Sequence, residues 1–235
     1  MAAPRGALQR GRPNVAAVVV GGLSPSIIKR TISSGADAVE LRIDAFKDIR
    51  VEYLVATVRD LGRVKPRLPV ILTVRSMVEG GKRDLTDARR LEIFKALMPY
   101  ADIVDVELSS SAIIKEVVRS AAEHSKKVMV SYHNFKSTPS IKTLGGIVKR
   151  AEKAGADIVK IAAFARSVKD VAALAGLLAG SDDLVVIAMG DCGRASRVFF
   201  PMMGSLVTYG SVTGSTAPGQ FTLKEIKKEF ARYGF

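Results

Sequence analysis

The feature that most constrains the fold is a regular alternation of two kinds of segment along the 235 residues. Eight short runs are rich in β-branched residues, and the segments between them have the apolar spacing of helices. The runs are residues 15–22, 38–44, 69–75, 103–108, 127–133, 157–164, 184–190 and 207–212. Strands that alternate with helices form right-handed βαβ units around a parallel sheet. Eight units in a chain of this length predict an α/β protein with a (β/α)8 TIM barrel.

An open doubly wound sheet is the alternative architecture. The first run is followed by GGLSP, whereas a dinucleotide-binding fold would have G-x-G-x-x-G there, so the barrel is favoured. Between the runs, residues 86–98, 111–124 and 141–156 are typical of helices. No linker divides the chain, which predicts a single catalytic domain over residues 15–235 after a flexible basic arm over residues 1–14.

The charge balance is strongly basic, with a formal net charge of +13 at pH 7. A basic nucleic-acid-binding module is one function class that fits this charge. However, the Lys and Arg residues are scattered, and no aromatic residues are interleaved with them in a binding motif. We therefore expect no nucleic-acid partner, and the charge is suited to attracting a small anionic substrate.

The sequence also bears on the compartment. No run approaches 18 apolar residues, and the first residues, MAAPRGALQRGRPN, lack an apolar signal core, so neither a membrane span nor a secretory signal is predicted. Cys192 is the only cysteine, which excludes an internal disulfide and a cysteine-based metal site. We expect a cytoplasmic protein with no membrane partner.

Ionisable residues end most of the predicted strands. In a barrel of this kind, the active site lies at the carboxyl ends of the strands. Glu40, Arg42 and Asp44 are spaced two apart, so they share one face of their strand. A ring of structural ion pairs is the alternative to a functional role. The residues at these ends are Glu40, Arg42, Asp44, Arg75, Glu79, Glu107, His133 and Lys160.

Lys160 and His133 carry the sharpest chemical signal. Lys160 lies in the apolar run IVKIAAF, where burial and nearby arginines favour a neutral amine that attacks carbonyls and forms a Schiff base. A lysine that snorkels out of a strand end is the alternative. His133 ends the run VMVSYH, where it is either a proton-transfer group or a hydrogen-bonded strand terminus.

The segments after the seventh and eighth runs add binding candidates. Arg194 and Arg197 begin a predicted helix, where a guanidinium can hold a carboxylate. Residues 208–221 are rich in Gly, Ser and Thr, which fits either a lid or a flexible connection. We read Cys192 as a bystander and His124, at a predicted helix C-terminus, as structural.

Taken in order, these residues resemble the type I 3-dehydroquinate dehydratase family of the shikimate pathway. The matching pieces are ELR at 40–42, TVRS and EGG within 73–81, SYHNF at 131–135, VKIA at 159–162, MG at 189–190, SR at 196–197 and APGQ at 217–220. The resemblance implies a (β/α)8 barrel, no cofactor, no metal and a homodimer. It also implies Schiff-base loss of water from 3-dehydroquinate to give 3-dehydroshikimate, the third step toward chorismate and the aromatic amino acids.

The resemblance also implies residue roles. Lys160 matches the Schiff-base lysine, His133 the general acid and base, and Glu79 the glutamate that orients this histidine. The implied substrate-binding positions are Glu40, Arg42, Arg75, Arg197, Thr216, Gln220, Met189 and Tyr209. Asn134 and Thr216 depart from the aspartate and serine common in the family. A class I aldolase acting on a sugar phosphate is the rival, but it would need a phosphate cradle where Arg197 and APGQ stand.

Overall fold

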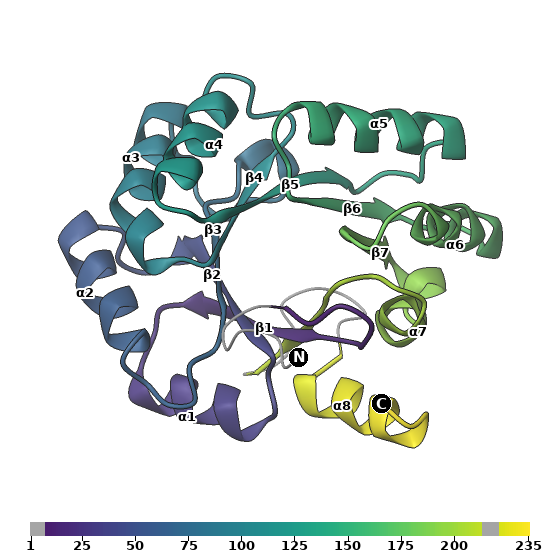
Figure 1. Ribbon diagram of the computed structural model, residues 1–235, viewed down its shortest axis with the longest axis horizontal. Coiled ribbons are helices and arrows are strands. Elements are labelled where there is room, and N and C mark those ends of the chain that lie inside the picture. Colours follow the sequence, from purple (N-terminus) through teal and green to yellow (C-terminus); the bar gives the residue numbers. More distant parts are fainter. Residues whose placement is uncertain (1–7, 213–220) are drawn as a thin grey trace.

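A single sheet of parallel strands curves around a central axis, with helices on its outside (Figure 1). The structure is a computed structural model and describes residues 8–212 and 221–235. The strands are β1 (Val15–Gly21), β2 (Ala38–Phe46), β3 (Val70–Thr73), β4 (Ile103–Glu107), β5 (Lys127–Asn134), β6 (Ile158–Phe164), β7 (Leu184–Met189) and β8 (Thr208–Ser211). The helices are α1 (Pro25–Ser33), α2 (Val51–Leu61), α3 (Asp87–Leu97), α4 (Ile114–Glu123), α5 (Ile141–Lys153), α6 (Val168–Ala175), α7 (Ser196–Met202) and α8 (Leu223–Arg232). The predicted (β/α)8 barrel is confirmed, with one strand in each predicted run.

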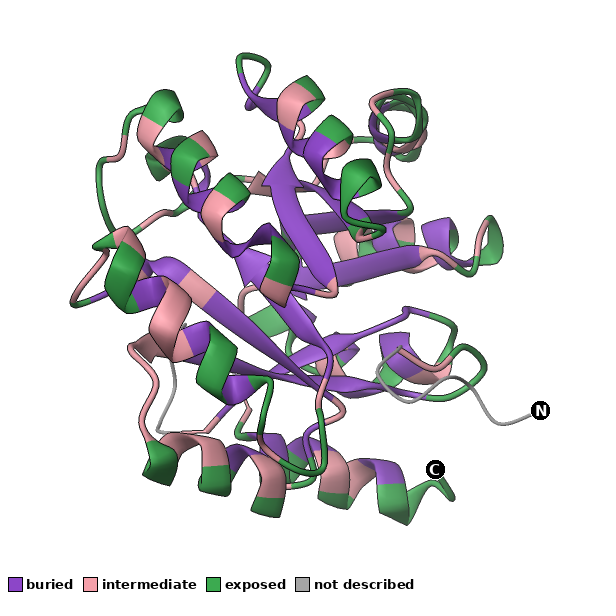
Figure 2. Cartoon of the chain, turned by 60° about the vertical axis from the view of Figure 1, so that its left-hand side comes forward, coloured by how far each residue is buried: buried purple, intermediate pink, exposed green. Residues whose placement is uncertain are grey.

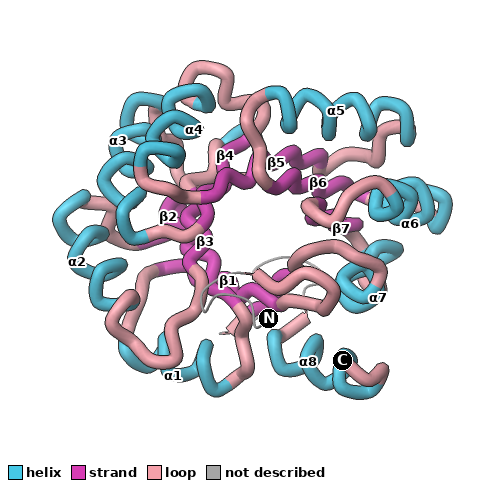
Figure 3. The backbone as a smooth tube through the Cα atoms, in the orientation of Figure 1, coloured by secondary structure: helices cyan, strands magenta, loops and turns pink. Residues whose placement is uncertain are grey.

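The two edge strands of the sheet, β7 and β8, face each other across a gap in the ring. The sheet order is β7-β6-β5-β4-β3-β2-β1-β8, which leaves these two strands at its edges. The residues just before β8 cover the gap: Leu206 N donates to Leu184 O at 2.8 Å, and Ser205 Oγ accepts from Val186 N at 2.9 Å. The strands therefore surround the axis as a nearly complete ring (Figure 3).

Alternate residues of each strand belong to two different parts of the core. One set points outward and packs under the helices, as Val39 and Leu41 of β2 do. The other set points inward and begins, at the amino ends of the strands, with an apolar layer. This inner layer includes Ala38, Ile71, Ile103, Met129, Ile158 and Val185. Figure 2 shows the strands buried along most of their length, while the helices expose their outer faces. Polar residues inside the barrel are therefore confined to the layers above this apolar base.

Three aspartates fix the starts of alternate strands. Each one directly precedes β2, β4 or β6. Its Oδ2 accepts a hydrogen bond from a backbone N–H of the strand before, which belongs to the first or second residue of that strand. The pairs are Asp37 with Val15 (2.8 Å), Asp102 with Val70 (2.9 Å) and Asp157 with Val128 (2.7 Å). In each pair the aspartate N–H also donates to the carbonyl of the same valine. This reciprocal pairing fixes the register of neighbouring strands at the amino ends of the strands.

The described part of the predicted arm, residues 8–14, lies across the same end of the barrel. Asn14 Nδ2 donates to Gln9 O and Leu206 O, both at 2.7 Å, and Arg10 pairs with Asp183 at 2.5 Å. Residues 1–7 lie outside the described residues, so a flexible arm stays a prediction for them. Among the helices that the structure describes, none is long and apolar enough to cross a membrane.

The aspartate pairs predict a measurable loss of stability. Asp157→Ala removes a charge-assisted hydrogen bond from the start of β5, and we expect the free energy of unfolding to fall by ~1–3 kcal/mol. Urea unfolding should show a lower midpoint with an unchanged slope. Asp182→Ala, at an exposed aspartate before β7, is the matched control and should leave the midpoint unchanged. Equal midpoints for both variants would contradict this role of Asp157.

Candidate active site

The largest group of predicted site residues lies around one cavity at the carboxyl ends of the strands. Its volume is about 540 Å³, which is suited to a small molecule. The predicted residues that line it are Glu40, Arg42, His133, Lys160, Met189, Arg197 and Tyr209. The barrel therefore brings together side chains that are up to 169 positions apart in the chain, from Glu40 to Tyr209.

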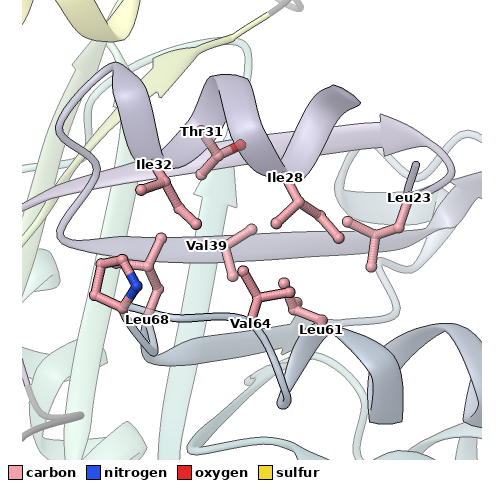
Figure 4. Close-up of a pocket in the computed structure, with 9 residues that line it drawn as sticks. Leu23, Ile28, Thr31, Ile32, Val39, Leu61, Val64 and Leu68 are labelled. Carbon is pink, nitrogen blue, oxygen red and sulfur yellow. The ribbon is translucent and has the colours of Figure 1, made fainter. Parts of the chain in front are cut away.

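Other hollows in the described chain contain none of these residues. A pocket of about 10 Å³ lies between α1 and the end of α2, and Figure 4 shows its apolar lining, which includes Ile28, Val39 and Leu61. An open hollow of about 900 Å³ at the amino ends of the strands is lined by charged residues such as Arg12 and Lys65. Because neither hollow brings together a nucleophile and a base, the cavity at the carboxyl ends is the candidate active site.

The strand register explains why polar groups meet inside the barrel. Glu107 of β4 lies beside Ser131 of β5, and Ser131 lies beside Lys160 of β6. Side chains two residues apart on one strand share a face, so Asp105 and His133 point inward as well. Together these residues form a polar layer above the apolar base of the barrel.

Lys160 is buried, with 4% of its surface exposed. Its Nζ lies 2.9 Å from Asp105 Oδ2 and 3.5 Å from Glu40 Oε1, and it sits 4.3 Å from the ring centroid of Tyr209. Burial alone would lower the pKa of Lys160, but the two carboxylates outweigh it and the pKa is raised. The sequence-based expectation of a neutral resting amine is wrong for the free protein, because it did not include Asp105.

Asp105 connects Lys160 to the rest of the polar layer. It is fully buried, and its carboxylate accepts from Arg75 Nη2 at 2.7 Å and from Ser131 Oγ at 2.6 Å. Burial alone would raise the pKa of Asp105, but Arg75 and Lys160 lower it below its ordinary value. Asp105 is therefore ionised and faces two cations.

Arg75 lies beneath the cavity and is not among its lining residues. Its Nη1 donates to Glu107 Oε1 at 3.0 Å, and Glu107 Oε2 in turn accepts from Arg90 of α3. Arg90 is itself 1% exposed, and its Nε donates to Val74 O at 3.0 Å. A chain of buried charges thus runs from α3 to Lys160. The predicted substrate-binding role of Arg75 stays a prediction.

Arg42, which is half-buried, forms a second pair with the buried Asp44. Arg42 Nε and Nη2 donate to the two carboxylate oxygens of Asp44, at 3.0 and 2.8 Å. Asp44 also accepts from the backbone N–H groups of Arg75 and Lys82. Burial opposes ionisation, but these donors lower the pKa of Asp44. The pair therefore ties β2 to the loop after β3 and holds the Arg42 guanidinium at the cavity wall.

His133 and Glu79 form the predicted oriented pair. Glu79, at the end of the 3-10 turn Met77–Glu79, accepts from both the backbone N and the ring Nδ1 of His133, each at 2.9 Å. Because Oε2 already accepts from a backbone N–H, we assign the proton to Nδ1, which leaves Nε2 as the basic atom. Burial, followed by Arg75 and Lys160, lowers the pKa of His133 well below 6.5, so the ring is neutral.

Arg197 differs from Arg42, Arg75 and Lys160 because, in the part of the chain that the structure describes, it has no carboxylate partner. It lies in the first turn of α7, and burial lowers its pKa to about 10, so it remains charged at neutral pH. Arg194, by contrast, stacks on Phe221, with 4.8 Å between Cζ and the ring centroid, and does not line the cavity. Arg197 is thus the cation best placed to accept a ligand carboxylate.

The remaining candidates have other placements. Thr216 and Gln220 lie outside the described residues. Cys192 is exposed and away from the cavity lining, while His124 Nδ1 lies 2.9 Å from Ser120 O at the end of α4. Asn134 shapes the turn after β5, since its Oδ1 accepts the N–H groups of Lys136 and Ser137. No group of three potential metal ligands is arranged for an ion within the described ranges.

Sequence reasoning gave no role to several residues that support the site. Asp105 and Ser131 belong to this group, and so do Arg90 and Lys82. For Asp105 a signal was present, because it stands two residues before Glu107 in a buried strand and must share its inward face. For Arg90 no such signal was present in the sequence, since a charged residue in a helix is expected to face solvent until its packing is known.

Comparisons with known proteins come from both sequence and structure. A family model described as type I 3-dehydroquinase matches residues 25–232. A 3-dehydroquinate dehydratase from Methanothermobacter thermautotrophicus is 36% identical over 199 residues, covering 85% of this chain and 86% of the relative. One from Aquifex aeolicus is 35% identical over 209 residues, covering 87% of this chain and 93% of the relative.

Solved structures agree with the sequence relatives. The crystal structure of the Aquifex aeolicus 3-dehydroquinate dehydratase has a TM-score of 0.84 at 33% identity and covers 94% of this chain and 99% of that one. A type I enzyme from Clostridium difficile has a TM-score of 0.88 at 27% identity and covers 95% of this chain and 93% of that one. The similarity therefore extends over nearly the whole barrel.

The buried charge chain makes a prediction about stability. Arg90→Met leaves Glu107 with one of its two cations, and breaking a buried pair in this way should lower the free energy of unfolding by ~3–5 kcal/mol. Arg119→Met is the control, because Arg119 forms only exposed pairs with Glu116 and Glu123 on α4, and it should unfold like the native chain. Thermal or urea unfolding measures both. Similar losses for the two variants would contradict the structural role of Arg90.

Proposed function

The chain belongs to the type I 3-dehydroquinase family, and we propose that it removes water from 3-dehydroquinate through a Schiff base on Lys160 to give 3-dehydroshikimate. Membership makes the protein a hydro-lyase with 3-dehydroquinate dehydratase activity in the shikimate pathway. The observation that carries the mechanism is the location of Lys160 and His133, which line one cavity on the adjacent strands β5 and β6.

In the proposed first step, Lys160 Nζ attacks the ketone carbon, and the carbonyl oxygen leaves as water. The lysine must first lose a proton. This requirement slows imine formation, because Asp105 and Glu40 favour the ammonium form. The same carboxylates favour the protonated imine that follows, because it carries its positive charge at the same nitrogen. That cation is the electron sink that makes the neighbouring CH2 acidic. The related enzyme from Clostridium difficile, solved with covalently modified comenic acid, supports covalent chemistry in this family.

In the second step, His133 Nε2 removes a proton from that CH2 to give an enamine. The enamine expels the β-hydroxyl, and the imidazolium returns the proton to it, so the leaving group departs as water. Water then hydrolyses the imine and releases the product from Lys160. Glu79 holds the Nδ1–H tautomer throughout and stabilises the transient charge on the ring. Each proton that His133 takes is therefore returned within the same turnover.

The substrate's carboxylate is assigned to Arg197, whose guanidinium has no partner in the described chain. Arg42 and Glu40 are assigned to the ring hydroxyls, with Met189 and Tyr209 as walls of the cavity. Arg75, Thr216 and Gln220 remain proposed substrate contacts on the basis of the family resemblance. We also propose a homodimer in the cytoplasm with no nucleic-acid partner, which size-exclusion chromatography and cell fractionation would test.

Reduction trapping tests substrate, nucleophile and reaction class together. Borohydride added with 3-dehydroquinate should leave a stable adduct on Lys160, detected by peptide mass spectrometry. Because the pKa of Lys160 is raised, trapping should become faster as the pH increases above neutral. The Lys160→Met variant should give no adduct, while Lys149→Met on the outer helix α5 should react like the native chain. An adduct on another lysine, or none in the native chain, would overturn the assignment.

Replacing the base gives a separate prediction. His133→Ala should reduce kcat by at least ~10²-fold, the usual scale of general acid and base catalysis, while the imine still forms and can be trapped. In the native chain burial lowers the pKa of His133 well below 6.5, so the loss of activity caused by protonating this base should appear only in the acid range. It is separate from the gain above neutral pH that comes from deprotonating Lys160. Steady-state rates measured as a function of pH test this prediction. A variant with near-native turnover would remove His133 from the mechanism.

A further inference from the structure

We propose that Lys47 and Lys82 form a cationic entrance to the active site that speeds the capture of the anionic substrate. The inference rests on the proposed function, because it requires a substrate with a negative charge. Both lysines are exposed, and both line the same cavity as Lys160 and Arg197. Neither was given a role by sequence reasoning, and we call the pair the entrance lysines.

The entrance lysines project from anchored backbone. Lys82 N donates to the buried carboxylate of Asp44 at 3.0 Å, and Lys47 N donates to Gly21 O at 3.2 Å. Arg83 Nη2 reinforces the second segment by donating to Phe46 O at 2.9 Å. The two ammonium groups are therefore carried by segments fixed to the rim of the barrel, although their side chains are in solvent.

Nearby carboxylates do not neutralise the entrance lysines. Asp44 is paired with Arg42 at 2.8 Å, and Asp48 is paired with Arg50 at 2.5 Å. Within residues 8–212 and 221–235, neither Lys47 nor Lys82 takes part in an ion pair. Their charges are thus available to an approaching anion, in contrast to the Lys160 charge, which faces Asp105.

The depth of the charges determines what each can do. Below the cavity, buried cations and carboxylates alternate, so their fields largely cancel at a distance. At the rim, the entrance lysines and Arg197 add positive charge, and none of the three forms an ion pair with a carboxylate of the described chain. A cleft with one sign of charge at its opening raises the local concentration of oppositely charged ligands. This arrangement predicts that the entrance lysines affect substrate capture and have little effect on the chemical step.

The alternative is that both lysines are ordinary solvated side chains. The two cases differ in their salt dependence, because attraction between solvent-exposed charges is screened over a Debye length of ~30 Å at 0.01 M and ~3 Å at 1 M ionic strength. Entrance lysines that attract substrate will make kcat/KM decrease with added salt. Lysines that are only solvated will leave the salt dependence of kcat/KM unaffected when they are removed.

The test compares two double variants across ionic strength. Lys47→Gln with Lys82→Gln should lower kcat/KM about fivefold at ~0.01 M salt, mainly through KM, with the difference falling below about twofold at ~1 M. Lys47→Glu with Lys82→Glu should give a larger loss, about twentyfold, at low salt. Lys149→Gln with Lys153→Gln on α5 is the control with the same change in net charge, and it should behave like the native chain.

The outcomes separate the two proposals. If the native chain does not turn over 3-dehydroquinate, the proposed function fails. If the native chain turns it over but the entrance variants keep its kcat/KM and salt dependence, only the entrance inference is overturned. Equal losses in the entrance and α5 variants would also overturn it, because net charge would then explain the effect. Circular dichroism and thermal unfolding of each variant confirm that the rates come from folded protein.

Discussion

The buried contact between Lys160 and Asp105 is the interaction on which the rest of the site depends. A lysine inside a barrel needs a counter-charge, because an isolated buried ammonium is too costly to remain ionised. Asp105 provides it, but a buried carboxylate between apolar layers also needs further donors, which Arg75 and Ser131 supply. Arg75 then requires Glu107, and Glu107 requires Arg90 on α3. Each buried charge thus requires the next, and the chain of pairs extends from Lys160 through the barrel wall to a helix.

The same charges set different protonation states for the proposed base, His133, and the proposed nucleophile, Lys160. His133 lies near Arg75 and Lys160, which together with burial lower its pKa, so it waits as a neutral base. Lys160 lies beside carboxylates that raise its pKa, so it waits as a cation. In the proposed mechanism, this arrangement slows the first attack on the ketone but favours every later species in which the nitrogen is charged. The structure therefore fits a site that stabilises the imine more than the free nucleophile.

Periodicity predicted the fold well because each strand and helix is specified locally. Every predicted strand lies in the barrel, and the spacing of Glu40, Arg42 and Asp44 correctly indicated one shared face. The electrostatic state of Lys160 could not be predicted in this way, because it depends on Asp105, which is 55 residues away in sequence. Arg90 was hidden for a similar reason, since its partner Glu107 comes from another element. Local pattern gives elements and candidate residues, whereas charge balance is a property of tertiary contacts.

The distribution of charge also explains how a strongly basic chain can maintain a selective site. If the whole excess of positive charge acted on the cavity, Lys160 would be driven toward its neutral form and the imine cation would be disfavoured. Buried carboxylates prevent this at the reacting nitrogen, because Asp105 and Glu40 dominate over short distances in a poorly solvated space. The excess is left to act at the rim and on the outer surface, where water screens it and only an approaching anion responds. In the two proposals, chemistry and substrate capture are therefore governed by different charges, separated by depth within a single barrel.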